Sequence, residues 1–547
     1  MGSNTYYTHF EKVISVFPIV YLHFLLYSLS HQLIITLSHL YSSVPVFLLP
    51  LCLLPIALYY QTPIFAAMNL MDKYQIVIGL EVHAQLQTNS KLFCGDSIAF
   101  GAEPNTHVSP VTLAHPGTLP KTNKKAVEYA VKLGIACNCE IVKYNYFARK
   151  NYFYPDLPKG YQISQHTTPI CKGGFVTIHS SEGEKHIQLN RIHIEEDAGK
   201  SIHDADDFYT CIDLNRAGTP LVEIVTEPCI HSSEDAYLYV TELRKLVQWL
   251  GVCDGNMEEG SLRCDANVSV RLKGETTLGT KVEVKNLNSI RNIKKAIDFE
   301  AERIVNLLEK GEAVIQQTRS FNADNDTTFS MRDKEDANDY RYFADPDLAP
   351  FNLTDEYINN VKAALPALPD ELRLRLTKEF GLSEYDTAIL CEDKETADYF
   401  LSVSAFNTHY KAIANWMLGP LKQYLNEHQI SYTEFTLKAE ILSQLINLVQ
   451  DGKVNFSVAS TKLLPELVIH NSSPLALAES LQLLQVRNAG ELEKWVDEVI
   501  TNMPDKVAEY KKGKKGLIGL FVGEVKKLSK GQADPKIVTE LLQKKLS

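Results

Sequence analysis

The sequence predicts an α+β fold in which a large sheet-containing domain precedes an all-helical C-terminal third. From residue 72 to about residue 350, short β-branched or alternating segments stand between Gly, Pro and Asn turns, which is typical of strands. After the turn-forming segment 366–370, apolar residues recur at helical spacing. With 547 residues, of which 45% are hydrophobic, the chain is long enough to form several packed domains.

Composition excludes two classes of protein. Charged residues make up 22% of the chain, and the 27 Gly and 23 Pro are close to average usage, which excludes a disordered or collagen-like protein. The 10 Cys are scattered, with only Cys137 and Cys139 close together, so we expect no disulfide framework and a reducing, cytoplasmic location. A net charge of −12 does not exclude nucleic acid, because the clustering of basic residues decides that.

The first 71 residues form an apolar extension that differs from the rest of the chain. Residues 13 to 71 contain no Asp, Glu, Lys or Arg, and prolines interrupt the apolar runs at 13–29 and 44–60. A signal peptide fits poorly, because the apolar stretch is too long. Two explanations remain, a membrane hairpin or a wrongly assigned start codon. We favour the start-site error, because a charged, amphipathic sequence begins directly after Met71.

Strands outnumber helices between residues 72 and 365. The expected strands are Ile76 to His83, His186 to Ile194, Thr219 to Val225, Ala266 to Arg271 and Lys281 to Val284. The expected helices are Lys124 to Leu133, Ser233 to Leu250 and Asn292 to Lys310. This mixture is typical of an α+β domain.

The C-terminal third is predicted to be helical. Leu437, Ile441, Leu445 and Leu448 recur at helical spacing until Gly452 supplies a stop. Turn-forming residues at 471–474 indicate a further boundary. We therefore expect a helical domain at 366–471 and a separate tail at 472–547.

The tail is the basic end of the chain. Residues 501–547 contain 11 Lys against five Asp and Glu. Such lysines could follow a phosphate backbone, which is the sequence-independent part of nucleic-acid binding. A solvated helix face is the alternative.

Three acidic segments could carry chemistry. In the first, strand alternation places Glu81 and His83 on one face, where a carboxylate and an imidazole could bind a divalent cation or transfer a proton. In the second, Glu195, Glu196 and Asp197 stand together at a strand end, and like charges repel unless a cation or several donors offset them. A solvated strand and a solvated acidic turn are the respective alternatives.

The third segment is a strand with one polar face. Alternation places Asp265, Asn267, Ser269 and Arg271 together, and Glu283 adds an acid flanked by lysines. Ordinary cross-strand salt bridges are the alternative. Together the three segments predict a hard-metal site, such as Mg²⁺, that serves phosphate chemistry.

Several long motifs are similar to one family. Those that resemble the B-subunit family of aspartyl/glutamyl-tRNA amidotransferases are, in order, Ile78 to His83, Arg149 to Asp156, Glu195 to Ser201, Asp213 to Arg216, Glu258 to Asp265 and Asp339 to Phe343. The likeness extends over residues 72–547. It implies a large mixed-sheet, cradle-shaped catalytic (kinase) domain at 72–365, a helical domain at 366–471 and a YqeY-like tRNA-binding tail at 472–547.

The resemblance also implies a reaction. Family members use ATP and Mg²⁺ to phosphorylate the side-chain carboxylate of Glu-tRNA(Gln) or Asp-tRNA(Asn). Ammonia that the amidase (A) subunit releases from glutamine then displaces the phosphate, and the heterotrimer is completed by a small (C) subunit. The enzyme is therefore expected to be a glutamine-dependent carbon–nitrogen ligase that acts without a membrane.

Site residues follow from the same resemblance. The family's metal positions correspond to Glu81, His83, Glu196 and Asp265, with Glu195 and Glu283 as less certain neighbours. Of these, Glu81, His83 and Glu196 are expected to be catalytic. In the tail, the residues expected to bind tRNA are Lys511, Lys512, Lys514 and Lys515.

The chain departs from the family at one point. Many relatives hold zinc with four thiols, but of the corresponding positions only Cys94 is a cysteine here. Structural zinc needs about four N or S ligands, so we expect none. Two other hypotheses remain open: a non-catalytic tRNA-binding scaffold, and a membrane-anchored form that uses residues 13–60.

Overall fold

The structure is a computed structural model that describes residues 71–333, 340–485, 488–529 and 531–547. The predicted apolar extension, with both explanations for it, falls on residues 1–70 and lies outside the described residues. Within the described ranges, every helix is too short or too polar to span a bilayer.

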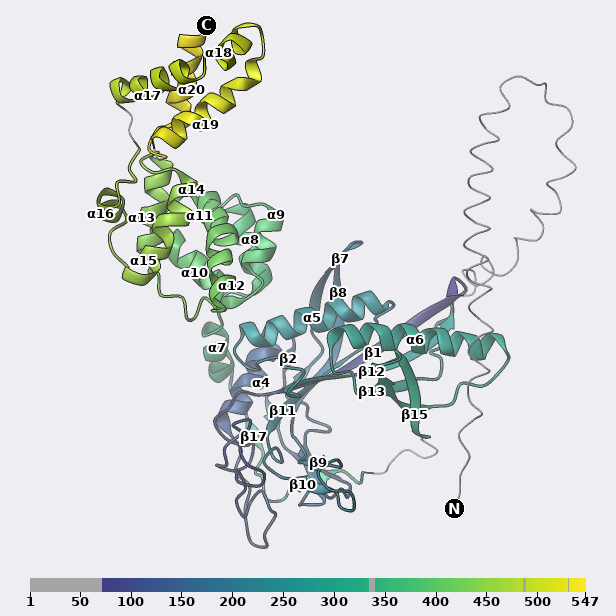
Figure 1. Cartoon of the computed structure of the whole chain (residues 1–547). Helices are drawn as coiled ribbons and strands as arrows, with labels where there is room; N and C mark the ends of the chain where they lie inside the picture. The colour runs from purple at the N-terminus through teal and green to yellow at the C-terminus, as the bar shows by residue number, and fades with distance from the viewer. Residues whose placement is uncertain (1–70, 334–339, 486–487, 530) are drawn as a thin grey trace, which may run out of the picture. The chain divides into compact units, whose positions relative to one another are not determined.

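A ten-stranded mixed sheet forms the first half of the described chain (Figure 1). Its strands are β1 (Tyr74–Gln85), β2 (Glu140–Ile141), β6 (Cys171–Lys172), β7 (Phe175–Ser180), β8 (Gly183–Glu196), β11 (Pro220–Thr226), β12 (Leu262–Leu272), β13 (Val282–Lys285), β14 (Gln317–Asn322) and β15 (Thr327–Asp333). They run in the order β15-β14-β13-β12-β1-β11-β8-β6-β2, with β7 paired to β8. Only the β13–β14 pair is parallel among the pairs described.

Three smaller sheets accompany the large one. They are built from β3 (Tyr144–Asn145), β4 (Ala148–Asn151), β5 (Tyr161–Ser164), β9 (Lys200–Ile202), β10 (Cys211–Asp213), β16 (Phe343–Ala344) and β17 (Phe351–Asn352). The pairings are β9 with β10, β3 with β17, and β4 between β5 and β16.

Four helices belong to the sheet-containing region: α4 (Lys124–Ala136), α5 (Ser233–Trp249), α6 (Ile290–Glu309) and α7 (Asp355–Ala363). Side-chain caps start the three longest helices, because Asn123, Ser232 and Ser289 accept hydrogen bonds from backbone N–H groups of the first turn. Helices α5 and α6 contact each other and lie on one side of the large sheet, while β9 and β10 lie on the other side (Figure 1).

The two faces of the large sheet differ in chemistry. Leu80, Val82 and Ala84 of β1 are fully buried on the helix-covered face, together with Ala266 and Val268 of β12. On the other face, Glu81 and His83 of β1 and Arg263, Asp265 and Asn267 of β12 are polar and only partly buried. Period-2 alternation therefore separates an apolar core face from a polar face, as predicted for the strands that contain Glu81 and Asp265.

The C-terminal part is helical. Its first helices are α8 (Pro369–Lys378), α9 (Glu384–Leu390), α10 (Lys394–Ser404), α11 (Tyr410–Trp416), η1 (Met417–Leu421), α12 (Lys422–His428), α13 (Ala439–Gln450), α14 (Phe456–Val458), η2 (Ala459–Leu463), α15 (Leu464–His470) and α16 (Pro474–Ser480). The tail holds α17 (Ala489–Asn502), α18 (Pro504–Lys511), η3 (Lys515–Leu517), α19 (Ile518–Leu528) and α20 (Pro535–Leu546).

The helices pack around two separate cores. Phe400, Trp416 and Leu445 belong to the first core, and Phe521 and Leu542 belong to the second. The α+β fold class, with helices after the sheet, is thereby confirmed. The domain boundaries at residues 365 and 471 stay predictions.

The turn-forming residues at 471–474 run from the end of α15 to the start of α16. Asn471 adopts a left-handed conformation with φ of 47° and ends α15, which is a common way for a helix to stop. The following helix α16 packs on the first core through Ala478, and the second core begins with Leu492. The change of core therefore falls between α16 and Leu492.

The buried Glu300 of α6 gives a test of this fold. Its fully buried carboxylate lies 2.8 Å from Arg303 Nε and 2.8 Å from Arg319 Nε of β14. We expect Glu300→Gln to lower the free energy of unfolding by about 3–5 kcal/mol, because it leaves two guanidinium groups without their buried counter-charge. Denaturant unfolding of the full chain measures this loss. The matched control is Glu302→Gln at an exposed position of the same helix, for which a change within about 0.5 kcal/mol is expected; equal effects would contradict the prediction.

Candidate functional site

A cavity of about 710 Å³ lies on the polar face of the large sheet. Strands β1, β8, β11, β12 and β13 contribute side chains to it. Six carboxylates line it, from Glu81, Glu195, Asp197, Glu223, Asp265 and Glu283, together with four Lys and Arg side chains, from Lys150, Arg191, Arg263 and Lys285. The carboxylates outnumber the permanently charged cations, which suits a site that takes up a further cation.

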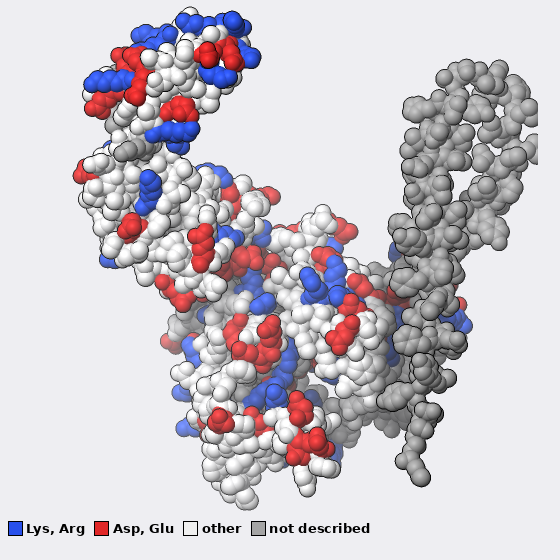
Figure 2. Space-filling model, viewed as in Figure 1, with Lys and Arg blue, Asp and Glu red and all other residues white. Residues whose placement is uncertain are grey.

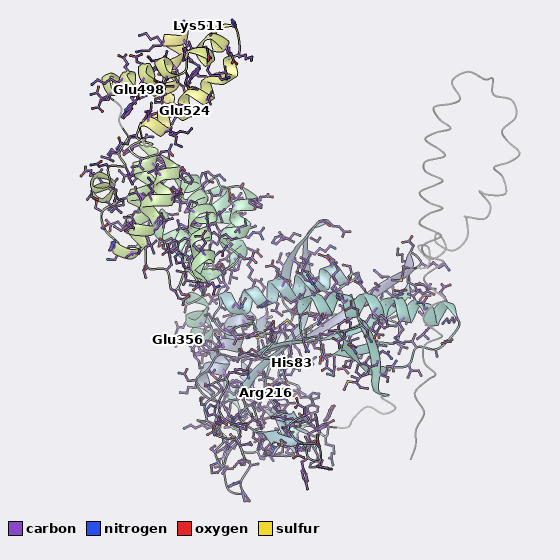
Figure 3. The ribbon with its side chains drawn as sticks, viewed as in Figure 1. His83, Arg216, Glu356, Glu498, Lys511 and Glu524 are labelled. Atoms are coloured by element: carbon purple, nitrogen blue, oxygen red, sulfur yellow. The ribbon has the colours of Figure 1, made fainter. Side chains whose placement is uncertain are left out.

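Two histidines and two glutamates form the centre of this lining. His83 Nε2 lies 3.6 Å from Glu195 Oε1 and 3.5 Å from Glu223 Oε2. His193 Nε2 lies 3.6 Å from Glu195 Oε2 and 3.2 Å from Glu223 Oε2. One possible ligand atom from each of His83, Glu195 and Glu223 lies within 4.8 Å of the other two. Figure 3 labels His83 on the sheet.

Strand pairing sets this geometry. In the antiparallel register, His83 of β1 stands opposite Glu223 of β11, and Glu223 stands opposite His193 of β8. Glu195 follows two residues after His193 on β8, so its side chain lies on the same face. Three adjacent strands therefore each contribute to the centre from neighbouring positions.

The carboxylates control the protonation of both imidazoles. Burial disfavours the charged form of His83, but its hydrogen bond with Glu223 and the charge of Glu195 outweigh burial and raise its pKa. At His193, burial also disfavours the charged form, but Glu223 and Glu195 outweigh it and raise the pKa to about 9. Burial works against ionisation of Glu223, yet the two histidines hold its pKa well below the usual range. The two glutamates thus favour the protonated form of both imidazoles.

The other acids predicted from the sequence lie beside this centre. Glu81 lines the cavity and accepts a hydrogen bond from Asn267 Nδ2 at 2.8 Å. Asp265 stands directly opposite Glu81 in the register and accepts from Lys285 Nζ at 2.6 Å. Glu283 lies 3.2 Å from the same ammonium group. The structure therefore brings Glu81, His83, Asp265, Glu195 and Glu283 to one cavity.

Glu196 does not line this cavity. It is 1% exposed, and its carboxylate accepts hydrogen bonds from Lys159 Nζ at 2.5 Å and from the backbone N–H of Ile163 at 2.8 Å. Neighbouring strand residues point to opposite faces, so Glu195 faces the cavity and Glu196 faces away. A metal-ligand and catalytic role for Glu196 stays a prediction, and this geometry favours Glu195 in its place.

Aromatic side chains form a further part of the cavity lining. Tyr342 stacks on His166 with ring centroids 3.9 Å apart, and Tyr340 lies 6.1 Å from the rings of both Tyr342 and Tyr152. Burial raises the pKa of Tyr342 to about 12, so its hydroxyl group stays protonated at neutral pH. This side of the cavity offers flat surfaces and hydrogen-bond donors.

The four tail lysines are exposed, from the last residue of α18 through the turn after it to the first residue of η3. Lys514 Nζ donates to Glu509 at 3.1 Å, and the ammonium group of Lys515 lies 4.3 Å from the ring of Tyr510. Figure 2 shows basic side chains gathered with acidic ones on the tail, and Figure 3 labels Lys511 there. The structure brings these lysines into one short segment of the surface.

Cys94, the thiol that remains at the expected zinc position, lies in a hydrogen-bonded group of oxygen atoms. Its Sγ lies 3.3 Å from Asp96 Oδ2 and 3.4 Å from Thr112 Oγ1. The same carboxylate oxygen accepts hydrogen bonds from the backbone N–H of Ser109 at 2.8 Å and from the Thr112 hydroxyl at 2.5 Å. A thiol among oxygen groups that bind one another does not match the ligand set of structural zinc.

Sequence reasoning missed Glu223 and His193 as site residues. Glu223 is the one charged residue of the apolar strand β11, and a lone acid inside such a strand is a signal for a site. His193 has the same parity on β8 as Glu195, so alternation could have placed both beside His83. Arg263 stands opposite His83 in the register and was also overlooked.

Comparisons with known proteins agree with this geometry. Residues 76–359 match the GatB/GatE catalytic domain, and residues 398–546 match the GatB domain. Three relatives carry the name of the B subunit of aspartyl/glutamyl-tRNA(Asn/Gln) amidotransferase. That from Geotalea daltonii is 48% identical over 87% of this chain and 99% of the relative, that from Persephonella marina is 47% identical over 87% and 100%, and that from Thermodesulfovibrio yellowstonii is 48% identical over 86% and 99%.

These matches cover both the sheet-containing region and the helical region. The match to a catalytic domain favours an enzyme subunit over a non-catalytic scaffold. The resemblance inferred from the motifs is confirmed. The chain belongs to the GatB family, the B subunits of tRNA-dependent amidotransferases, which are glutamine-dependent carbon–nitrogen ligases.

Proposed function

We propose that this chain transfers the γ-phosphoryl group of ATP to the side-chain carboxylate of Glu-tRNA(Gln) or Asp-tRNA(Asn) within the sheet cavity. A carboxylate oxygen forms a bond to phosphorus while the bond between phosphorus and ADP breaks. Ammonia then attacks the acyl carbon of the resulting mixed anhydride, phosphate leaves and the nitrogen loses a proton. The products are the amide, ADP and phosphate.

The observation that carries this proposal is the row of carboxylates on one face of the sheet. A bare carboxylate is a poor acyl donor, because its leaving group would be oxide, whereas the acyl phosphate has phosphate as leaving group. Phosphoryl transfer brings several negative oxygens together. A cavity lined by six carboxylates would repel them unless cations offset the charge, which supports chemistry that uses a divalent metal.

The residues present fit Mg²⁺. Glu195 and Glu223 would hold it through carboxylate oxygens, which suit a hard cation, and His83 would add an imidazole nitrogen. Glu81 and Asp265 are neighbouring acids. When bound, the ion would supply positive charge next to the phosphate oxygens. His193 has a buried Nδ1 atom with no hydrogen-bond partner among the described residues, and its Nε2 orients Glu195 and Glu223.

Glutamine hydrolysis would take place on another chain. We propose that ammonia comes from the amidase (A) subunit and that the third member of the heterotrimer is the small (C) subunit. The cavity of this chain would receive the misacylated tRNA end and ATP and keep the acyl phosphate from water. We further propose that the complex works in the cytoplasm, without a membrane.

Replacement of Glu223 tests the cation site. We expect Glu223→Gln to lower the rate of ATP-dependent amidation by at least about 100-fold, because an amide removes one charge from the centre of the site. The assay uses the reconstituted heterotrimer and Glu-tRNA(Gln), with glutaminase activity measured in parallel. Glutaminase activity should persist, since its chemistry would lie on the amidase (A) subunit.

The matched control for this substitution is Glu227→Gln. Glu227 follows β11 and accepts from Asn190 at 2.8 Å, outside the cavity lining of the described residues. Its amidation rate should stay close to that of the wild type. Normal amidation by Glu223→Gln would refute the assignment, and the Glu81→Ala variant should likewise lose amidation but keep glutaminase activity.

Charge reversal in the tail tests tRNA binding. Replacing Lys511, Lys512, Lys514 and Lys515 with Glu should weaken the binding of tRNA by the complex and flatten its salt dependence, because fewer phosphates would be neutralised. Filter binding over a series of salt concentrations measures both effects. Unaltered affinity and salt slope would show that these lysines are solvated surface residues.

Metal analysis tests the expected lack of structural zinc. The surroundings of Cys94 supply one thiol and several oxygen groups that bind one another, so we expect far less than one zinc per chain. Elemental analysis of protein purified without chelators measures the ratio. A stoichiometric amount of zinc would contradict the expectation.

A further inference from the structure

Two arginines meet at one buried carboxylate beside the cavity. Arg216 binds Asp197 with two groups, Nε to Oδ2 at 2.6 Å and Nη2 to Oδ1 at 3.2 Å. Arg263 Nη2 donates to Oδ2 of the same carboxylate at 3.0 Å. The Asp197 side chain is 7% exposed, whereas those of Arg216 and Arg263 are 32% and 35% exposed.

The two arginines carry more positive charge than Asp197 balances, and both side chains are partly exposed. One carboxylate balances one of the two guanidinium groups, so the trio carries a net charge of about +1. Within the described part of the chain, the Nη1 groups of both arginines and the Nε group of Arg263 donate no hydrogen bond to protein. Planar guanidinium groups with remaining donors are the preferred protein partners of phosphate oxygens.

Arg263 lies where two cavities meet, and Arg216 lines the second of them. A second cavity of about 870 Å³ is lined by Arg216, Lys200 and Arg263, among others. Arg263, Met257 and Asn288 line both this cavity and the one that holds the acidic centre. A ligand with a chain of phosphates could therefore extend from the second cavity, past the arginines, to the first.

Strand register places Arg263 close to the proposed cation site. Arg263 of β12 stands opposite His83 of β1, and His83 lies 3.6 Å from Glu195 and 3.5 Å from Glu223. A phosphate held by Arg263 would thus lie next to the proposed cation site. Asp254, Glu258 and Glu259 also line the second cavity. Their carboxylates disfavour a phosphate beside them and so favour one at the arginines.

We propose that Arg216 and Arg263, held in place by Asp197, clamp the phosphate chain of a nucleoside triphosphate whose nucleoside part occupies the second cavity. The proposal rests on the proposed phosphoryl transfer and adds the residues that position the donor. The two arginines contact the phosphates, and Asp197 is a positioning residue that fixes both guanidinium planes. The phosphates of the tRNA end would be the competing ligand for the same donors.

The test compares ATP kinetics of variants in the reconstituted heterotrimer. Arg216→Gln and Arg263→Gln should each raise the KM for ATP by at least about tenfold, while the affinity for Glu-tRNA(Gln) and the glutaminase rate stay unchanged. Inorganic tripolyphosphate, used as a probe without a nucleoside, should compete with ATP in the wild type and less well in either variant. Asp197→Asn should raise the KM for ATP with a smaller effect on kcat.

Two further variants control for folding and for charge. Arg271→Gln alters an arginine on the same strand that binds Gln75 and Thr276 and, among the described residues, lines neither cavity; its KM for ATP should match the wild type. Arg216→Lys keeps a positive charge for Asp197 but loses the planar fork, so an intermediate KM is expected if the clamp is correct. Thermal unfolding identifies any variant that fails to fold. If Arg216→Gln fails to fold, the KM for ATP of Arg216→Lys tests the clamp in its place.

Three results would overturn the clamp. An unchanged KM for ATP in both arginine variants, with wild-type turnover intact, would refute it and leave the proposed function standing. Weaker tRNA binding with an unchanged KM for ATP would assign the arginines to the tRNA end. A wild-type complex that consumes no ATP with Glu-tRNA(Gln) would refute the proposed function and the clamp together.

Discussion

The antiparallel register of β1 between β11 and β12 is the constraint on which the site depends. It sets His83 opposite both Glu223 and Arg263, and Glu81 opposite Asp265. A shift of one residue would turn each of these side chains toward the helix-covered face. There they would replace the apolar residues Leu80 and Val82, which are fully buried, so burial of the core face maintains the polar face in its correct register.

The second constraint on the site is the repulsion among its carboxylates. Carboxylates on adjacent strands repel one another unless protons, lysines, arginines or metal ions offset them. Lys285 forms ion pairs with Asp265 and Glu283. Arg216 and Arg263 donate hydrogen bonds to Asp197. The imidazoles of His83 and His193 pair with Glu195 and Glu223. Of these partners only the imidazoles are common metal ligands, so a cation that enters the site would displace a proton at their position.

Strand alternation and helical spacing made much of the fold predictable, because both patterns are local. Each strand and helix expected in the sheet-containing region overlaps an observed one, and the pairing of Glu81 with His83 on one face followed from period 2 alone. The choice of Glu196 came from the family's motif, although the same alternation favours Glu195 beside His193. A motif names a segment, whereas the geometry of the strand decides which of two adjacent acids faces the cavity.

Other parts of the site could not be predicted, because they depend on long-range contacts. The carboxylate of Asp197 joins Arg216, 19 residues later, and Arg263, 66 residues later, and no local pattern specifies that meeting. Similarly, Tyr342 and His166 come together from distant segments. The resemblance indicated the family and its reaction, but the neighbours of each reacting group required the folded chain.

Anomalous scattering from crystals of the heterotrimer grown with Mn²⁺ in place of Mg²⁺ would locate the cation directly. The structure predicts a peak bound by His83 Nε2 and by carboxylate oxygens of Glu195 and Glu223. A cation bound elsewhere, for example by Asp254 and Glu258 in the second cavity, with the His83 centre lacking a peak, would contradict it.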